Sequence, residues 1–279
     1  MSGYDFGIPG SRLLQQSREG GRGNVILVIG EGQGAKVLKI FRRRSSAFLE
    51  ILGDFTSWFI HGKTGFSVRC RYETEKRTHD RWSRFGMPVL NRLNIPVPPE
   101  AGGMAIWYEW CSGRRLSELM ADDSIEWTKK DDLLEKLGSE TGRRHDIAIR
   151  EQEPLLVHEH SALKHFFVEG ERLVGFDFEG GYGPRYALRE AMADEFSGIL
   201  RSIAQTTGDR YPEAFRSFAR GYGNTDRLRG IAVWASSGGG IRRRLKRLRD
   251  FFLRDRFSKT VVLRRLAEML GSDSSVRNR

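Results

Sequence analysis

The feature that most constrains the fold of this chain is the uneven distribution of its strand and helix patterns. Short apolar runs, several of them rich in β-branched or aromatic residues, lie between glycine and proline turns in the first part of the chain and predict strands over residues 12–16, 24–29, 35–41, 89–95 and 104–110. Helical periodicity covers residues 45–62, 67–85, 116–120, 126–144, 188–205 and 211–222, and later strand signals occur only at Val168 and 173–178. A β-rich part followed by an α-rich part predicts an α+β protein with two unlike lobes.

The two predicted lobes meet near Cys111, where the strand pattern gives way to helices. We expect an N-lobe over residues 1–111, a C-lobe over 112–240 and a basic helical segment over 241–279. The chain has 279 residues, of which 39% are hydrophobic and 11% aromatic. This length and composition are sufficient for a sizeable core.

Positive charge is concentrated at the C-terminal end, where residues 241–279 carry +9 of the net charge of +11. An anionic partner is therefore expected there: phospholipid, lipopolysaccharide or nucleic acid. Ile241, Leu245, Leu248 and Phe252 form one helical stripe among arginines, which suits either an anionic membrane surface or packing on the C-lobe. Nucleic acid is less favoured because no binding motif accompanies the charge.

The chain shows no pattern of a membrane-spanning or exported protein. Its longest apolar run, Val25 to Ile29, is far shorter than the roughly 20 residues of a spanning helix. Residues 1–5 lack a basic or apolar leader, so we expect a cytoplasmic location, with the basic end at the inner face of the membrane. Cys70 and Cys111 are too few for a disulfide framework and are expected to be buried thiols.

A lysine inside a strand begins a set of residues suited to binding phosphates. The strand 36–39, Lys-Val-Leu-Lys, resembles the Val-Ala-Ile-Lys motif of protein kinases, which would place Lys39 against the α- and β-phosphates. Before it lies a glycine-rich turn that contains Gly20, Gly21 and Gly23. In the helix that follows, Glu75 is expected to pair with Lys39, with Glu73 as the competitor on another face.

The strand over 104–110 and the turn after it have two interpretations. They resemble the fifth strand and hinge of a kinase, where backbone groups of Glu109 and Cys111 would hold adenine. An ordinary amphipathic strand and turn would have the same local pattern.

The segment from His158 to Gly180 resembles a kinase catalytic loop, His-Arg-Asp-x-x-x-x-Asn, followed after a hairpin by Asp-Phe-Gly. Asp177 then corresponds to the metal-binding aspartate. His165 and Phe166 form the His-Phe pair that heptose kinases have in place of asparagine, and the chain is similar to the kinase-like enzymes that phosphorylate heptose or Kdo of the lipopolysaccharide core. The similarity runs from about Arg12 to the helix near Asp194.

Two positions depart from that family pattern. Glu159 replaces the loop arginine, and His160 stands where the catalytic aspartate is expected. The resemblance implies a kinase that uses ATP with Mg or Mn to phosphorylate a sugar hydroxyl of a glycolipid. In it, Asp177 and His165 hold the metal, and His160 with Glu159 orients the hydroxyl.

Three other interpretations remain open at the level of sequence. The first is a pseudokinase that binds nucleotide as a regulator or scaffold. The second is a basic surface-binding protein that uses the kinase frame only as a scaffold. The third takes His158, His160 and His165 as ligands of a transition metal, because alternating residues of an extended segment face the same side.

Overall fold

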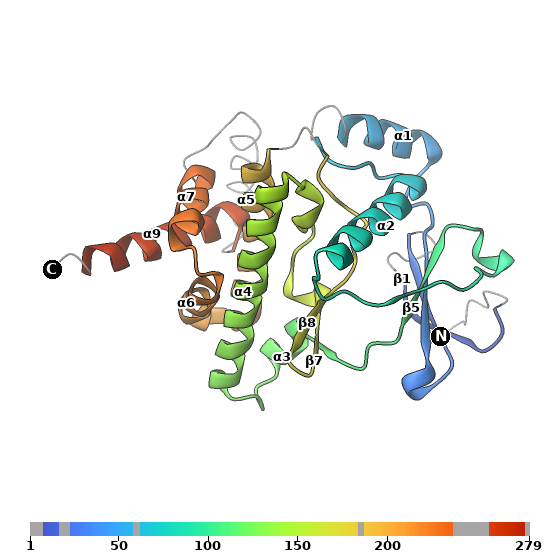
Figure 1. The fold of residues 1–279 in the computed structure, drawn as a ribbon, viewed down its shortest axis with the longest axis horizontal. Coiled ribbons are helices and arrows are strands. Elements are labelled where there is room, and N and C mark those ends of the chain that lie inside the picture. The colour runs from blue at the N-terminus through green and yellow to red at the C-terminus, as the bar shows by residue number, and fades with distance from the viewer. Residues whose placement is uncertain (1–7, 17–22, 58–61, 184–186, 237–256, 277–279) are drawn as a thin grey trace. The chain divides into compact units, whose positions relative to one another are not determined.

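The structure is a computed structural model that describes residues 8–16, 23–57, 62–183, 187–236 and 257–276. The chain divides into two compact units, shown in Figure 1. The first consists of residues 1–113 with 174–185, and the second of residues 114–173 with 186–279. Residues 174–185, which begin within the last strand, thus belong with the β-rich part, although they lie within the stretch 112–240 that we assigned to the C-lobe.

The first unit is built on a five-stranded antiparallel sheet in the order β1-β2-β3-β5-β4. Its strands are β1 (Ser11–Gln16), β2 (Val25–Ile29), β3 (Lys36–Ile40), β4 (Arg92–Leu93) and β5 (Ala105–Glu109). Strand β3 is central, and its Lys39 pairs with Ile26 on one side and Ile106 on the other. The β-branched and aromatic residues of β2, β3 and β5 favour strands, as predicted.

The two faces of this sheet have separate cores, because successive side chains of a strand point to opposite faces. Leu27, Leu38, Ile40 and Trp107 belong to the core of one face. The core of the other face includes the buried residues Phe41, Ile106 and Tyr108. The partly buried Val37 and Tyr72 pack against them. Lys39 alternates with Val37 and Phe41, so it lies on this second face.

Two helices complete the first unit. Helix α1 (Ala47–Thr56) begins at Ser46, whose hydroxyl accepts a hydrogen bond from the backbone amide of Leu49. Helix α2 (Val68–Arg84) begins at Ser67 in the same way, and its residue Tyr72 packs edge-on against Phe41 at a centroid distance of 5.7 Å. Helix α2 therefore covers the face of the sheet that carries Lys39.

Some predicted elements are shorter than expected. Strand β4 has two residues instead of the seven of 89–95, a segment in which Asn91 and Asn94 have low strand propensity. The strand predicted over 173–178 ends at Gly175, because Asp177 has a left-handed backbone conformation that a strand cannot contain. Of the helix predicted over 45–62, α1 covers Ala47–Thr56, and residues 58–61 lie outside the described part of the chain.

The second unit is mainly helical. Its helices are α3 (Leu116–Ala121), α4 (Trp127–Glu151), α5 (Leu188–Thr207), α6 (Tyr211–Tyr222), α7 (Thr225–Ser236) and α9 (Lys259–Val276). A small sheet in the order β6-β7-β8 contains β6 (Arg114–Arg115), β7 (Phe166–Glu169) and β8 (Arg172–Gly175). Helix α9 buries Val262, Leu263 and Leu266, while the predicted basic stripe over 241–252 lies outside the described residues.

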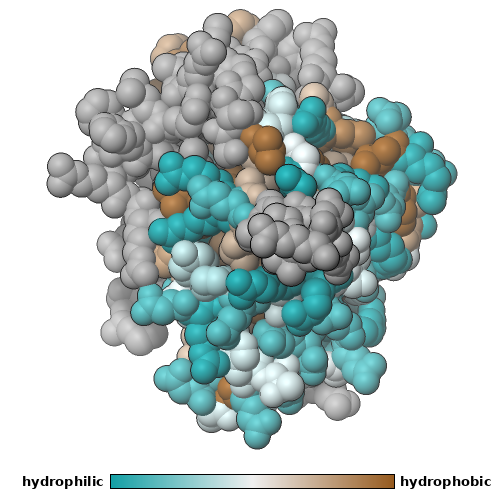
Figure 2. Space-filling view, turned by 90° about the vertical axis from the view of Figure 1, so that its left-hand side faces the viewer, coloured by the Kyte–Doolittle hydropathy of each residue, from teal (hydrophilic) through white to brown (hydrophobic). Residues whose placement is uncertain are grey.

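Two further features are the burial of the cysteines and the character of the surface. Cys70 and Cys111 form no disulfide in the described part of the chain and are only half-buried, so the expectation of buried thiols was wrong. Among the described residues, no helix has the length and apolar character needed to cross a membrane. On the face drawn in Figure 2, hydrophilic residues predominate among those coloured, and hydrophobic residues are exposed in small separate groups. Such scattered exposure is usual for protein surfaces.

Candidate active site

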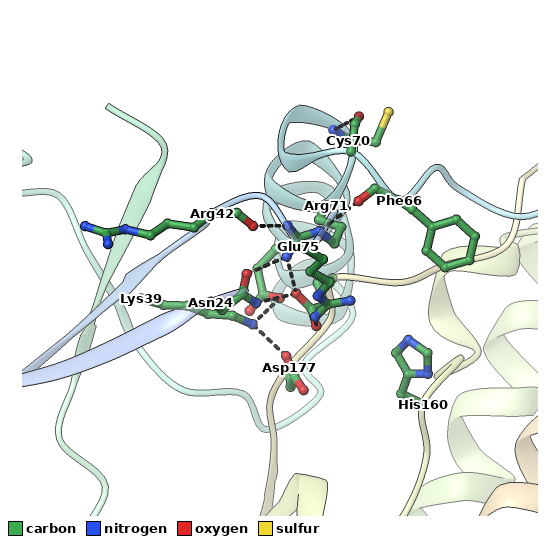
Figure 3. Close-up of polar contacts among 12 residues, drawn as sticks. Asn24, Lys39, Arg42, Phe66, Cys70, Arg71, Glu75, His160 and Asp177 are labelled. Carbon is green, nitrogen blue, oxygen red and sulfur yellow. Dashed lines mark hydrogen bonds and ion pairs between the residues drawn. The ribbon is translucent and has the colours of Figure 1, made fainter. Parts of the chain in front are cut away.

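Lys39, Glu75 and Asp177 meet in the first unit (Figure 3). The ammonium Nζ of Lys39 lies 3.0 Å from Oε2 of Glu75 and 2.6 Å from Oδ1 of Asp177. The side chains of Lys39 and Glu75 are 7% and 2% exposed, whereas that of Asp177 is 28% exposed. The structure thus brings together three predicted site residues that come from β3, α2 and the segment after β8.

Glu75, and not Glu73, is the residue of α2 that pairs with Lys39. Glu75 lies on the buried stripe of the helix, whereas Glu73 is half-buried on another face. The hydroxyl of Tyr108 donates a second hydrogen bond to Glu75, 2.8 Å from Oε1. Both carboxylate oxygens therefore accept a bond, which fixes the side chain against the sheet.

Lys39 keeps its positive charge although its side chain is buried, because two carboxylates lie beside it. Burial by itself lowers the pKa of Lys39, but the attraction of Asp177 and then of Glu75 outweighs it and raises that pKa well above its ordinary value. Burial raises the pKa of Glu75, and Lys39 offsets this only in part. Lys39 is therefore charged at neutral pH and presents a fixed cation.

Asp177 is held in an uncommon backbone conformation, with a φ of 67°. Left-handed backbone in a residue other than glycine is tolerated best by Asn and Asp, and it persists where the surroundings enforce it. Here Phe178 packs against Trp82 at a centroid distance of 4.7 Å. A Cβ atom on Gly175 would lie 2.9 Å from the Trp82 ring, so the close approach of the segment to α2 requires glycine.

A second polar cluster surrounds Glu179, two residues beyond Asp177. Its carboxylate pairs with Arg71 of α2, 3.2 Å from Oε2 to Nη1, and also with Arg44 and the side-chain amide of Asn24. Burial alone would raise the pKa of Glu179, but the charges of Lys39, Arg44 and Arg71 lower it below its ordinary value. Glu179 is thus a buried anion compensated by cations.

Arg71 ties this cluster to the surrounding backbone. Its guanidinium donates to the carbonyls of Phe66 at 3.0 Å and Arg42 at 2.5 Å, and to the side-chain oxygen of Asn24. Arg71 and Glu179 were not among the predicted site residues. The available signal was the spacing of Arg71, four residues before Glu75 and hence on the same face of the helix.

In the second unit, a buried network holds the start of the predicted catalytic loop. Glu195 of α5 accepts a hydrogen bond from the backbone amide of His158 at 3.3 Å. The same carboxylate pairs with Arg144 of α4 at 2.5 Å and lies 2.9 Å from Nε2 of His145. The other ring nitrogen of His145 lies 3.0 Å from the hydroxyl of Tyr222. This network fixes the backbone just before His160.

The loop histidines lie near one another in this unit. The rings of His158 and His165 stack at a centroid distance of 5.8 Å, and Nδ1 of His165 bonds to the carbonyl of His160. The His160 side chain is 47% exposed, and its Nε2 is 3.9 Å from Glu159. Within the described residues, no group of three or more His, Cys, Asp or Glu side chains is placed to hold a metal ion, which removes the support for the three-histidine metal site.

The remaining predicted site residues are the glycines of the glycine-rich turn, Glu109 and Cys111. Gly20 and Gly21 lie outside the described residues, while Gly23 has a φ of 84° and donates its amide to the carbonyl of Arg43. Glu109 ends β5, and its backbone amide donates to the carbonyl of Asn91 at 2.9 Å. Cys111 follows it, two residues before the end of the first unit's main segment.

The chain is similar to some solved structures but to no known family. No protein-family model and no curated protein matches the chain. Among solved structures, the chain is similar to WaaP in complex with acyl carrier protein, with 13% identity over 80% of this chain and 85% of that one and a TM-score of 0.47. It is also similar to the PknI kinase domain of Mycobacterium tuberculosis, with 12% identity over 71% and 74% and a TM-score of 0.41.

Both matches are likenesses of fold at low identity. A lysine in a central strand, a glutamate in the next helix, and an aspartate after a later hairpin occur in the order typical of kinases. Identities this low concern the fold alone. The assignment of the site therefore rests on the contacts of Lys39, Glu75 and Asp177.

Proposed function

We propose that the protein is an ATP-dependent phosphotransferase that acts on a sugar hydroxyl of a lipopolysaccharide-like glycolipid. The observation that carries this proposal is the buried Lys39, held between Glu75 and the partly exposed Asp177. Phosphoryl transfer requires fixed positive charge beside the phosphates and a carboxylate for the divalent ion. These residues supply both.

The described residues suit a nucleotide with Mg or Mn. The Asp177 carboxylate is a hard oxygen ligand of the kind that Mg prefers, and it remains 28% exposed. The Lys39 ammonium suits phosphate oxygens, and the nucleotide would supply the phosphoryl group that is transferred. Gly20, Gly21 and Gly23 are proposed to cover the phosphates, and backbone groups of Glu109 and Cys111 to hold adenine.

The acceptor side is assigned to the loop of the second unit. His160, assisted by Glu159, is proposed to accept the hydrogen bond of the sugar hydroxyl, because imidazole can act as a general base. His165 is proposed as a metal ligand. Imidazole suits manganese better than it suits magnesium, so we expect faster turnover with Mn.

A pseudokinase that binds nucleotide as a regulator or scaffold is the second candidate. The observation that favours it is His160, a neutral or cationic side chain at the position where kinases have an aspartate. Without that carboxylate, position 160 offers no anionic anchor for the metal shell. Nucleotide binding would then persist without transfer.

A thermal-shift experiment tests the nucleotide site. ATP with Mg or Mn is expected to raise the melting temperature, since a ligand that binds only the folded state stabilises it. Lys39→Ala or Asp177→Asn should abolish the increase, whereas Lys36→Ala, on the exposed end of the same strand, should retain it. The double variant K39M/E75Q avoids leaving a buried carboxylate without its cation. An ATP response equal to the wild type in both Lys39 variants and in Asp177→Asn would refute the site.

A turnover experiment decides between enzyme and pseudokinase. ATP labelled on the γ-phosphate is incubated with bacterial glycolipid extract, for the wild type, His160→Ala and Asp177→Asn, with each metal. Labelled glycolipid that is lost in both variants supports the kinase and the role of His160. ATP binding without transfer in any condition supports the pseudokinase.

The location of the protein follows from the acceptor. We propose that it works in the cytoplasm, at the inner face of the membrane, with residues 241–260 contacting anionic lipid. Residues 241–256 lie outside the described part of the chain, so this contact rests on their charge alone. Truncation at Ser236 is expected to weaken binding to anionic vesicles.

A further inference from the structure

Helix α1 has its apolar face turned toward solvent. Phe48 is 73% exposed and Ile51 is 69% exposed, and three further large hydrophobic residues of this ten-residue helix are also exposed, namely Leu49, Leu52 and Phe55. At 100° per residue these five side chains fall on one side of the helix. A helix of a globular protein normally turns such a face toward the core.

The polar face of α1 is the one that packs on the first unit. Glu50 is buried, and its carboxylate accepts a hydrogen bond from the backbone amide of Arg44 at 2.9 Å. Asp54 accepts bonds from the backbone amides of Phe66 and Ser67, the latter at 2.7 Å. Both acidic side chains of the helix are thus bound to the protein.

The surroundings of the apolar face are basic. Phe66, half exposed, lies beside Gly53 and adds an aromatic ring next to the helix. Arg43 precedes α1 and Arg69 follows Phe66, and both are exposed. The outward face therefore combines aliphatic and aromatic side chains, exposed arginines lie close to it in the sequence, and both carboxylates of α1 are bound to the protein.

We propose that α1 is a membrane-binding helix that inserts its apolar face into an anionic lipid surface. Interfacial helices have this combination of an apolar face and flanking cations, and they lie at shallow depth in the plane of the headgroups. Charge complementarity selects a lipid surface with anionic headgroups. The proposal assigns membrane contact to a described helix of the first unit, and it does not depend on phosphoryl transfer.

Vesicle binding of the full chain tests the surface. Phosphatidylcholine vesicles with and without about a third phosphatidylglycerol are sedimented with the wild type and with the triple variant F48S/I51S/F55S. We expect the triple variant to lose at least about tenfold in partitioning, and R43Q/R69Q to reduce the salt dependence. The control is I149S/V233S, which removes exposed hydrophobic residues of the second unit and should bind as the wild type does.

A fluorescent probe separates α1 from any other basic segment that binds lipid. In a Cys70→Ser, Cys111→Ser background, an environment-sensitive dye on Ile51→Cys should shift to the blue with anionic vesicles. The same dye on Ile149→Cys, exposed on α4, should not shift. An unshifted dye at residue 51 in chains that sediment with vesicles would overturn the proposal. A wild type that dimerises without vesicles, and a triple variant that stays monomeric, would assign the face to a second copy instead.

Discussion

The carboxylate of Glu179 and the guanidinium of Arg71 form a buried ion pair, which joins the segment after Asp177 to the first turn of α2. The same helix carries Glu75, the partner of Lys39. One helix thus fixes both the lysine that we propose for phosphate and the chain direction just beyond Asp177. The position of the site depends on this pair.

We expect Arg71→Met to destabilise the protein strongly. It would leave Glu179 buried with fewer cations and remove the donor to the carbonyls of Phe66 and Arg42. Removal of one partner of a buried ion pair typically lowers the free energy of unfolding by about 3–5 kcal/mol. Urea denaturation measures this cost. Arg77→Met, exposed on the same helix, is the control and should change stability by less than about 0.5 kcal/mol.

Addition of Glu179→Gln to Arg71→Met should recover part of the loss, because the unpaired buried charge is then removed. A double variant whose loss equals the sum of the two single losses would show that the pair is not coupled.

We expect Glu75→Gln to separate function from stability. Burial raises the pKa of Glu75, so its charge contributes little to stability, and a neutral amide of the same shape should lower the melting temperature only slightly, because Asp177 still compensates Lys39. Lys39 would lose one of its two carboxylates, and misplacement of the ammonium should lower turnover roughly 10- to 100-fold. Glu73→Gln, on another face of α2, is the matched control. Equal activity in the two variants would contradict the role of Glu75.

The contacts of Lys39 could be predicted from the sequence because each residue lies in a local pattern. A strand, a helix and a hairpin place Lys39, Glu75 and Asp177 in order. The partners of Glu179 could not be predicted in this way, since Asn24 and Arg71 are 155 and 108 residues away and no spacing rule links them. Asp177 also interrupts a run that otherwise reads as a strand, because its φ of 67° is set by packing around Phe178.

The outward direction of the apolar face of α1 could not be predicted from the sequence for a related reason. Periodicity identifies an apolar face but does not say which way it points. Glu50 and Asp54 find backbone donors inside the first unit, and this turns Phe48 and Ile51 outward.

We expect glycine at position 138 to be required for the packing of α4 on α6. A Cβ atom there would lie 2.1 Å from the carbonyl oxygen of Phe218 and 2.7 Å from the amide of Tyr222. Gly138→Ala should therefore destabilise the protein by about 1–3 kcal/mol, or more if the helices cannot separate. Gly230→Ala in α7, where an added Cβ atom would meet no atom within 4 Å outside the backbone of its own helix, should instead stabilise it by about 0.5–1 kcal/mol. Chemical denaturation of both variants would detect the opposite signs.

The buried network around Glu195 predicts a loss of stability in acid. Burial alone would raise the pKa of Glu195, but Arg144 and His145 outweigh it and lower the pKa to about 2, from an ordinary value of 4.5. A depressed carboxylate pKa stabilises the folded state above the unfolded pKa, and this contribution of about 3 kcal/mol is lost as the pH falls from about 4.5 toward 2. Burial lowers the pKa of His145. As the pH falls below about 6.5, the unfolded state therefore binds a proton at this residue before the folded state does, which favours unfolding.

Stability should accordingly fall in two steps as the pH is lowered, the first from His145 and the second from Glu195. Denaturation curves between pH 7 and pH 3 measure both. His145→Gln should flatten the first step, and Glu195→Gln should lower stability at pH 7, because Arg144 loses its buried partner, and flatten the second. Glu140→Gln, which removes a surface pair with Arg143 on the same helix, should leave the curve nearly unchanged. A curve for Glu195→Gln that parallels the wild type below pH 4.5 would show that other carboxylates cause the acid loss.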